Sequence, residues 1–305
     1  MRFLNFGSIN IDYVYHVDHF VRPGETELSE GERGTFSGGK GFNQSVALAK
    51  AGAEVYHAGK ISREDSFLLK ELESAGVRTD FIQQVGMYTG HAIIQVDTTG
   101  QNCILLSAGA NHTMTETFID EVLSHFGAGD VLLLQNEINR IDSIIEKAHA
   151  RGMTIVLNPS PINKPLLSYP LDKVTCFLLN EIEGQELTGR SDPAQILERM
   201  QIQFPGCAVV LTLGKDGVCY WDGKERGRHG IYDVEVVDTT AAGDTFTGYF
   251  LACRYQHQET IARALEKASI ASSLAVSKNG AAASIPLLAD VHAHKDKLPY
   301  ILPNV

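Results

Sequence analysis

One stretch of the sequence combines a carboxylate with the small residues that often open a helix. It runs Asp238-Thr-Thr-Ala-Ala-Gly-Asp-Thr-Phe246, and aromatic residues follow at helical spacing, so we expect a loop that leads into a helix at Asp244. The first turn of a helix has unpaired N–H groups and a partial positive charge, which suits phosphate. A neighbouring carboxylate could accept the proton of a hydroxyl group that attacks phosphorus. Asp is also a common N-cap, so a structural role for Asp244 stays open at this point.

A second glycine-rich stretch, Ser37-Gly-Gly-Lys-Gly-Phe-Asn43, precedes another expected helix, which ends at Gly52. Counted from Gly34, it nearly fits the P-loop pattern, but Gly41 stands where a Ser or Thr should hold magnesium. We therefore reject a P-loop and expect a helix start that offers one cation and one amide to a hydroxyl-rich ligand. A tight helix-packing turn would explain the glycines equally well.

Polar side chains follow several expected strands at the point where each strand ends. Asp12 follows the first strand, and the later clusters are Gln135-Asn136-Glu137, Asn158-Pro-Ser160, Asn180-Glu-Ile-Glu183 and Thr212-Leu-Gly214. The carboxyl ends of parallel strands form one edge of a sheet, so these clusters predict one long cleft. Asn180 and Glu183 suit a magnesium ion held mostly through water, although Glu183 could equally lie in a first helical turn for reasons of the helix dipole.

Strands and helices alternate along most of the chain, which predicts an α/β fold with a doubly wound, mainly parallel sheet. Two segments break this alternation, namely 13–36 and 87–109, and each has the pattern of paired strands. We expect them to form a small sheet apart from the main body, either a lid or a dimer surface. The predicted domains are thus an α/β domain of residues 1–12, 37–86 and 110–305, and a lid of residues 13–36 and 87–109.

Three local patterns add details to these expectations. Ser62 and Asp65 are spaced like a capping box before a helix over 64–75, and Thr113 with Glu116 predicts a helix that reaches His125. The histidine pairs His16/His19 and His292/His294 come with no nearby Cys or carboxylate cluster, so we expect them to be solvated or structural.

Composition excludes several classes of protein. The net charge of −11 argues against a nucleic-acid partner, which demands clustered Lys and Arg. No apolar run approaches the length of a membrane span, and the N-terminus lacks a signal-peptide pattern. The five cysteines form no CxxC pair, so we expect them to be small buried hydrophobic residues in a cytoplasmic protein.

These motifs give the sequence a resemblance, along nearly its whole length, to the ribokinase (PfkB) family of carbohydrate kinases. The stretch around Asp244 is similar to the second signature of that family. The other matching blocks are Gly7-Ser-Ile-Asn-Ile-Asp12, Pro23-Gly-Glu-Thr26, Gly38-Gly-Lys-Gly-Phe-Asn-Gln44, Thr89-Gly90 with Val96-Asp97, Gly109-Ala-Asn111, Asn158-Pro159, Asn180-Glu-Ile-Glu183 and Thr212-Leu-Gly214. The resemblance implies a doubly wound α/β domain with a β-sheet lid that also makes homodimers.

The resemblance also implies a role for each matching residue. The sugar hydroxyl groups would be held by Asp12, Gly39, Lys40, Asn43 and Glu137. Asp244 would be the base for the primary hydroxyl, and the amides of Ala241, Ala242, Gly243 and Asp244 would stabilise the transferring phosphoryl group. Asn180, Thr212 and Gly214 would contact ATP, while Asn180 and Glu183 would serve Mg²⁺, Glu183 through water. A potassium site would comprise Asp238, Thr240, Ala275, Gly280 and Ser284.

The expected activity is an ATP-dependent phosphorylation of a pentose, with D-ribose giving the 5-phosphate as the first choice. The alternatives are the same chemistry on deoxyribose, fructose or a nucleoside, and a catalytically silent sugar-binding regulator. Phe42 departs from the family, in which Ala is usual, and because it flanks the expected sugar loop this departure bears on the choice of sugar.

Overall fold

A nine-stranded sheet forms the centre of the protein in a computed structural model that describes residues 1–302. Its strand order is β13-β12-β11-β10-β9-β8-β1-β4-β5, and β5 to β11 all run parallel, whereas β12 and β13 are antiparallel. The chain starts in the middle at β1, builds outward through β4 and β5, and then returns to β8 on the other side of β1. This reversal of winding direction confirms the predicted doubly wound, mainly parallel sheet.

The elements have the following bounds. The strands of the large sheet are β1 (Phe3–Phe6), β4 (Val55–Ser62), β5 (Arg78–Val85), β8 (Val131–Gln135), β9 (Thr154–Asn158), β10 (Cys176–Asn180), β11 (Ala208–Thr212), β12 (Val218–Trp221) and β13 (Arg226–His229). The helices are α1 (Lys40–Lys50), α2 (Phe67–Ser74), α3 (Glu116–Leu123), α4 (Ile141–Ala150), α5 (Glu181–Thr188), α6 (Pro193–Gln203), α7 (Ala242–Leu251), α8 (Ile261–Val276) and α9 (Leu288–His294). Strands β14 (Ile231–Tyr232) and β15 (Tyr300–Ile301) pair near the C-terminus.

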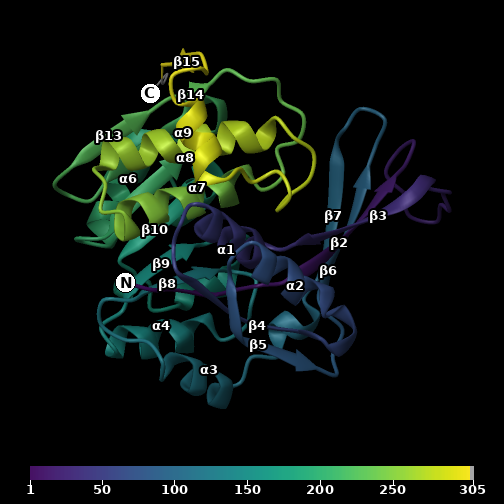
Figure 1. The fold of residues 1–305 in the computed structure, drawn as a ribbon, viewed down its shortest axis with the longest axis horizontal. Helices are drawn as coiled ribbons and strands as arrows, with labels where there is room; N and C mark the ends of the chain where they lie inside the picture. Colours follow the sequence, from purple (N-terminus) through teal and green to yellow (C-terminus); the bar gives the residue numbers. More distant parts are fainter. Residues whose placement is uncertain (303–305) are drawn as a thin grey trace.

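Helices cover both faces of the large sheet (Figure 1). Successive side chains of a buried strand point to opposite faces, so they pack into two separate cores. Phe3 and Leu133 pack with α1, α2, α7 and α8 on one face. Leu4 and Leu132 pack with α3, α4 and α6 on the other. Within residues 1–302 no helix is long and apolar enough to cross a membrane.

A separate four-stranded sheet projects from the main body (Figure 1). Its order is β3-β2-β6-β7, with β2 (Asn10–His16), β3 (Glu30–Gly38), β6 (Gly90–Val96) and β7 (Asn102–Ser107). These strands come from the two segments that interrupt the strand–helix alternation. The structure extends them slightly beyond the predicted bounds, since β2 already begins at Asn10 and β3 continues to Gly38.

Two of the predicted helix starts are wrong in detail. Ser62 accepts a hydrogen bond from the Glu64 N–H and opens a short 3₁₀ turn, whereas Asp65 accepts from the Thr89 hydroxyl group, so these residues form no capping box. Helix α3 is capped by Thr115, whose side chain accepts from the Phe118 N–H, rather than by Thr113. The spacing of the residues predicted these two caps. In the structure, the hydrogen bonds that nearby polar groups make determine which residue caps each helix.

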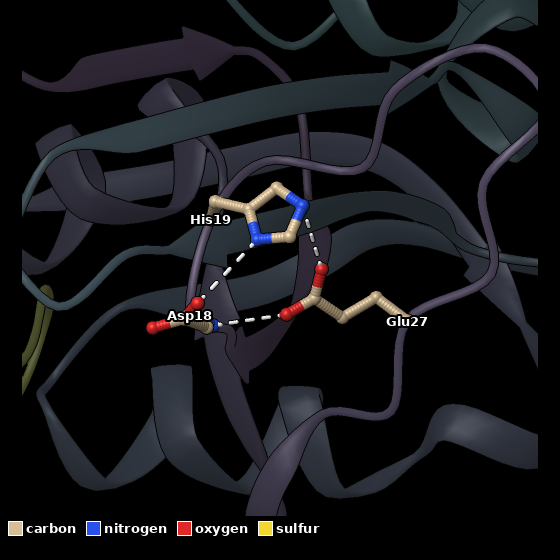
Figure 2. A group of neighbouring side chains, drawn as sticks. All are labelled: Asp18, His19 and Glu27. Atoms are coloured by element: carbon tan, nitrogen blue, oxygen red, sulfur yellow. Dashed lines mark hydrogen bonds and ion pairs between the residues drawn. The ribbon is translucent and has the colours of Figure 1, made fainter.

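The expectation that His19 has no carboxylate partners is also wrong. In the loop between β2 and β3, its Nε2 lies 3.0 Å from Glu25 Oε1 and 3.2 Å from Glu27 Oε2, and its Nδ1 lies 3.6 Å from Asp18 Oδ2. Figure 2 shows Asp18 and Glu27 on either side of the ring. The hydrogen bond to Glu25 and the neighbouring charges raise the pKa of His19. The ring thus fastens the loop by contacts to Glu25 and Glu27, which lie six and eight residues further along the chain, as well as to the adjacent Asp18.

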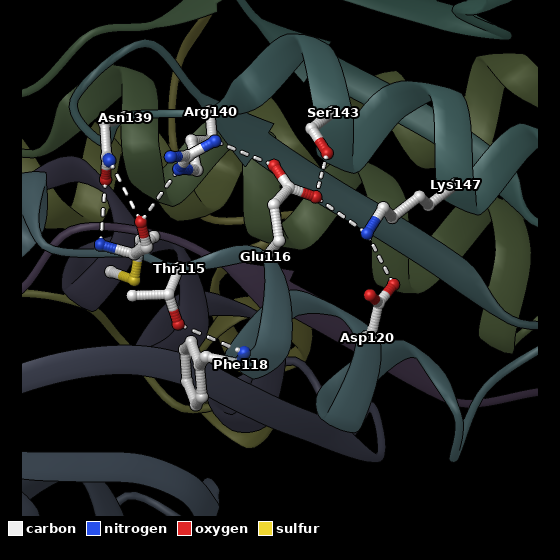
Figure 3. Close-up of polar contacts among 9 residues, drawn as sticks. Thr115, Glu116, Phe118, Asp120, Asn139, Arg140, Ser143 and Lys147 are labelled. Atoms are coloured by element: carbon white, nitrogen blue, oxygen red, sulfur yellow. Dashed lines mark hydrogen bonds and ion pairs between the residues drawn. The ribbon is translucent and has the colours of Figure 1, made fainter.

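Helices α3 and α4 are joined by a surface network centred on Glu116 (Figure 3). Its carboxylate accepts from Arg140 Nη1 at 2.9 Å and from the Ser143 hydroxyl group at 2.8 Å, and it lies 2.7 Å from Lys147 Nζ. The hydrogen bond from Lys147 is the main reason that the pKa of Glu116 is lowered to about 2. Exposed pairs of this kind contribute little stability, so the buried apolar faces hold the two helices together.

Helices α1 and α7 approach each other closely at Gly248. A Cβ atom there would lie 2.4 Å from Ala47 Cβ and 2.7 Å from the Leu48 backbone nitrogen. Only a residue without a side chain permits this approach, because backbone atoms cannot move aside as a flexible side chain would. The contact brings the N-terminal ends of the two helices, and hence both glycine-rich motifs, to one side of the sheet.

We predict that Gly248→Ala lowers the free energy of unfolding by roughly 1–3 kcal/mol, since overpacking outweighs the better helix propensity of Ala. Urea denaturation measures the change. Gly86→Ala is the matched control, because a Cβ atom there meets nothing within 4 Å. Equal stability of the two variants would show that α1 and α7 do not depend on this contact.

Candidate active site

A cleft of about 270 Å³ lies at the carboxyl edge of the large sheet. Its lining comprises Lys40, Asn158, Ser160, Leu178, Leu179, Asn180, Glu183, Thr212, Thr239, Ala241, Ala242, Gly243, Asp244 and Thr247. These residues come from the starts of α1, α5 and α7 and from the ends of β9, β10 and β11. Ligands of doubly wound sheets bind at this edge, near the point where the winding reverses, which here lies between β1 and β8.

Asp244 lies in the first turn of α7 and is 8% exposed. The N-cap of this helix is Ala241, which has φ of 59° and makes no side-chain capping bond, so Asp244 is not the cap. The Ala242 N–H already donates to the Thr239 carbonyl at 3.3 Å. The N–H groups of Gly243 and Asp244 follow in the same first turn, where intrahelical acceptors are lacking. The left-handed backbone at Ala241 stores strain of the kind found at functional sites.

Two side-chain amides of α1 hold the Asp244 carboxylate. Asn43 Nδ2 donates to Oδ2 at 3.0 Å, and Gln44 Nε2 donates to Oδ1 at 2.9 Å. Asn43 is 5% exposed, and its Oδ1 has no hydrogen-bond partner within the described residues. A buried acceptor without a donor is costly, so this atom is suited to a ligand hydroxyl group.

Glu137 and Lys40 lie beside this pair. One oxygen of Glu137 accepts from the Ser8 hydroxyl group at 2.5 Å and from the Lys40 N–H at 3.0 Å. Burial raises the pKa of Glu137 despite the opposing effect of Lys40. Burial alone would lower the pKa of Lys40, but the charges of Asp244, Glu137 and Glu183 outweigh it and raise that pKa. Gly39 precedes α1 with φ of 88°, a conformation that favours glycine.

Asp12 reaches the same charged group from β2 and is half-buried. Burial is the main cause that raises the pKa of Asp12 to about 6, and the charges of Glu137 and Asp244 add to the effect. The carboxylates of Asp12, Glu137 and Asp244 thus lie close enough to influence one another, and the charges of Glu137 and Asp244 also act on Lys40. Such crowding is typical of functional sites, since folding alone gains nothing from it.

Asn180 and Glu183 form a capping box at the start of α5. The Asn180 side chain accepts from the Glu183 N–H at 2.9 Å, and Glu183 Oε2 accepts from the Asn180 N–H at 3.0 Å. The structural alternative for Glu183 is therefore correct, and its carboxylate still lines the cleft. Thr212 ends the neighbouring strand β11 and lines the cleft too, and Gly214 begins the turn that follows.

The loop before α7 is tied to the loop after α8. Asp238 accepts from the Thr240 N–H at 2.8 Å and from the Gly280 N–H at 3.0 Å. Ala275 lies in the last turn of α8, and Ser284 is buried near the end of the second loop. These residues offer carboxylate, hydroxyl and carbonyl oxygen atoms, which is the donor chemistry that hard cations prefer.

The cluster Asn158-Pro-Ser160 lines the cleft through Asn158 and Ser160, as its position after a strand predicted. Other residues of the site were assigned no role from the sequence: Gln44 holds Asp244, and Thr239 and Thr247 line the cleft. A single Gln inside a predicted helix gave no signal of this contact. Phe42, which departs from the family pattern, is 1% exposed and packs into the core rather than into the cleft.

The fold and the site together define a class of protein: a doubly wound α/β enzyme with a buried carboxylate in the first turn of a helix that lines the cleft. The family model of the pfkB family carbohydrate kinases matches residues 3–288. The chain belongs to this family of kinases, which confirms the resemblance.

Individual relatives agree with this assignment. A ribokinase of Staphylococcus aureus (strain COL) is 36% identical over 300 residues, covering 94% of this chain and 97% of the relative. The crystal structure of ribokinase from Cryptococcus neoformans var. grubii serotype A in complex with ADP has a TM-score of 0.85 and 34% identity, covering 96% and 99% of the two chains. The structure of Arabidopsis thaliana ribokinase complexed with ribose and ATP has a TM-score of 0.83 and 28% identity, covering 97% and 98%.

We predict that Asp12→Asn stabilises the protein by about 1–3 kcal/mol at pH 8. The folded-state pKa of about 6 lies above the ordinary 3.8, so ionised Asp12 costs stability above pH 6, and this cost disappears below the ordinary pKa. Urea denaturation at pH 4 and pH 8 measures the difference, with the exposed Asp172→Asn as control. A gain of the same size at both pH values would contradict the prediction.

Proposed function

We propose that the protein transfers the γ-phosphoryl group of ATP to the primary hydroxyl of D-ribose, giving D-ribose 5-phosphate and ADP. One observation carries the proposal: the Asp244 carboxylate faces a cleft beside the first turn of α7, next to a buried oxygen of Asn43 that lacks a donor. A base, an anion site and an unpaired acceptor for a hydroxyl group thereby meet at one place. The names of the relatives, together with the Arabidopsis complex, favour ribose over deoxyribose, fructose or a nucleoside.

In this reaction the sugar lies against α1, where Asp12, Gly39, Lys40, Asn43 and Glu137 accept or donate hydrogen bonds to its hydroxyl groups. Asp244 accepts the proton of the attacking hydroxyl. The N–H groups at the start of α7, from Ala241 to Asp244, and the charge of Lys40 stabilise the phosphoryl group in transit. Asn180, Thr212 and Gly214 contact the nucleotide. Positioning of the reactants and electrostatic stabilisation account for most of the rate acceleration, because phosphoryl transfer needs only a weak base.

Two cations fit the oxygen-rich parts of the site. Glu183, beside Asn180, would hold Mg²⁺ through water, and the ion would supply positive charge to the phosphates of ATP. Both Glu183 oxygen atoms already accept hydrogen bonds from Asn180, which favours contact through water over direct coordination. We assign K⁺ to the oxygen atoms of Asp238, Thr240, Ala275, Gly280 and Ser284, whose loops adjoin the N-terminus of α7.

We predict that Asp244→Asn lowers kcat by roughly 10²–10⁴-fold, because the variant cannot accept the hydroxyl proton. An amide keeps a similar size, so the sugar should still bind, with a Kd within a few-fold of the wild-type value by calorimetry. A coupled assay of ADP release with D-ribose and a panel of other sugars, with and without potassium, measures turnover. A variant rate close to wild type would exclude Asp244 as the base, and no turnover by the wild type with any sugar would favour a silent regulator.

We further propose that the small sheet, with the segments 13–36 and 87–109, is a lid that also joins two copies into a homodimer. The ladder pairs Asp12 with Phe36 and with Ala92, and Ala92 with Leu106, so these side chains share one face. Phe36, Ile104 and Leu106 are each about half exposed. An apolar face of this kind is typical of an interaction surface, and a second copy would cover it while excluding water from the site.

The wild type should therefore sediment as a dimer at micromolar concentrations, and Ile104→Glu should sediment as a monomer with a raised KM for the sugar. Burying a charge on the shared apolar face would oppose association. Ile202→Glu, at a somewhat more exposed position on α6, is the control and should remain dimeric. A dimeric Ile104→Glu variant would refute this interface.

The protein's compartment follows from the same proposal. All five cysteines are free, and four of them are buried thiols, which suits a reducing compartment. Cys103 is exposed on β7, so the expectation that every cysteine is buried is wrong at that position. We propose that the enzyme works in the cytoplasm on small molecules, with neither nucleic acid nor membrane as a partner.

A further inference from the structure

The Asp244 carboxylate is connected to the centre of the sheet by a chain of buried neutral side chains. Gln44 is fully buried, and its Nε2 donates to Asp244 Oδ1 at 2.9 Å and to Asn158 Oδ1 at 3.1 Å. Its Oε1 accepts from Gln135 Nε2 at 2.7 Å. Both N–H bonds of the Gln44 amide are thus in use, and its oxygen has a donor.

The chain continues inward from Gln135. Its Nε2 also donates to Asn5 Oδ1 at 3.0 Å, and Asn5 Nδ2 donates to the Gly41 carbonyl at 2.7 Å and to the Ser45 hydroxyl at 2.8 Å. Gln135 and Asn5 are fully buried in β8 and β1, two neighbouring strands of the large sheet. Hydrogen bonds therefore connect Asp244 to two buried strands in the middle of the large sheet.

The two ends of the chain fix the orientation of every amide between them. A carboxylate has oxygen acceptors and no donor, so Gln44 must present its nitrogen to Asp244, and the Gly41 carbonyl likewise requires the nitrogen of Asn5. Turning any one amide would place oxygen against oxygen or nitrogen against nitrogen. The arrangement consequently has one low-energy form, even though Gln135 Oε1 has no hydrogen-bond partner within the described residues.

A buried histidine closes the network on the side away from the cleft. His57 Nδ1 lies 2.8 Å from the Ser45 hydroxyl, and its Nε2 lies 3.2 Å from the Gly7 carbonyl. Burial lowers the pKa of His57 to about 4, so the ring is neutral at pH 7 and adds no charge. Because the amides do not titrate either, the chain cannot carry a proton away from Asp244. It can only hold the carboxylate in place.

We propose that Gln44 is a positioning residue for the proposed base, aiming the free lone pairs of Asp244 at the sugar hydroxyl. Asn43 engages Oδ2 and Gln44 engages Oδ1, so the carboxylate cannot rotate about its terminal bond without losing a hydrogen bond. The two amides also stabilise the ionised form, which is the form that accepts a proton. This role rests on the proposed function, since it presumes that Asp244 acts as the base.

The test compares Gln44→Met, which keeps the volume but removes the donor, with Gln44→Glu, which keeps the shape. In Gln44→Met we expect kcat to fall about 10- to 100-fold, with KM for ribose and ATP within about threefold of wild type. The acidic limb of the kcat–pH profile should move to higher pH. In Gln44→Glu a protonated carboxyl group can donate to Asp244, so the ratio of its kcat to that of Gln44→Met should rise as the pH falls.

A purely structural role would give a different result. Gln201→Met is the matched control, since Gln201 Nε2 donates to the Cys207 carbonyl at 2.6 Å in a polar contact away from the cleft. It should keep the wild-type kcat and pH profile, even if its stability falls. The proposal is overturned if Gln44→Met retains kcat within threefold of wild type. It is also overturned if Gln44→Glu is no better than Gln44→Met at any pH. Should Gln44→Met fail to fold by circular dichroism, the pH profile of the isosteric Gln44→Glu decides.

A second measurement separates this proposal from the proposed function. The ¹³C carboxyl signal of Asp244, identified by its absence in Asp244→Asn, can be recorded without any substrate, and its chemical shift reports the hydrogen bond from Gln44. This chemical shift should change in Gln44→Met and stay unchanged in Gln201→Met. If no sugar is phosphorylated by the wild type, the proposed function fails while the changed signal still supports the contact. An unchanged signal in Gln44→Met overturns the positioning role whatever the activity.

Discussion

The structure depends on holding the Asp244 carboxylate in place with uncharged hydrogen-bond donors. Asp244 is buried close to the carboxylates of Asp12 and Glu137, whose own pKa values are raised mainly by burial. A salt bridge to Asp244 would occupy the lone pairs that the proposed chemistry needs. The chain instead uses uncharged donors, the side-chain amides of Asn43 and Gln44, together with the positive end of α7.

This arrangement requires two parts of the chain, about 200 residues apart in sequence, to pack against each other closely enough for their side chains to form hydrogen bonds. Asn43 and Asp244 are separated by 201 positions in the sequence, yet their side chains lie 3.0 Å apart. The close approach of α1 and α7 at Gly248 makes this possible, and the short distance from Ala47 leaves no room for even one methyl group. The core of one face of the sheet and the active site are therefore constrained by the same pair of helices.

Much of this architecture could be predicted from the sequence because its signals are local. The alternation of strands and helices predicts the doubly wound sheet, and the polar clusters at 135–137, 158–160 and 180–183 predict which edge holds the cleft. What could not be predicted depends on long-range partners. Asn5 and His57 lie in strands where nothing nearby shows that Ser45 will bridge them. The loop around His19 and the choice of Thr115 as a helix cap were likewise decided by neighbours in space.

The same reasoning explains why a cleft for an anionic substrate contains so few positive side chains at its centre. A lysine in direct contact with Asp244 would hold it as an ion pair and weaken it as a base, whereas backbone N–H groups attract phosphate without changing charge. Lys40 can remain charged because Asp244, Glu137 and Glu183 surround it and together raise its pKa. The Lys40 ammonium group thus interacts electrostatically with three carboxylates rather than with a single partner. Neutral donors can therefore fix the geometry of the proposed base, while the charge of Lys40 offsets part of the negative charge of the surrounding carboxylates.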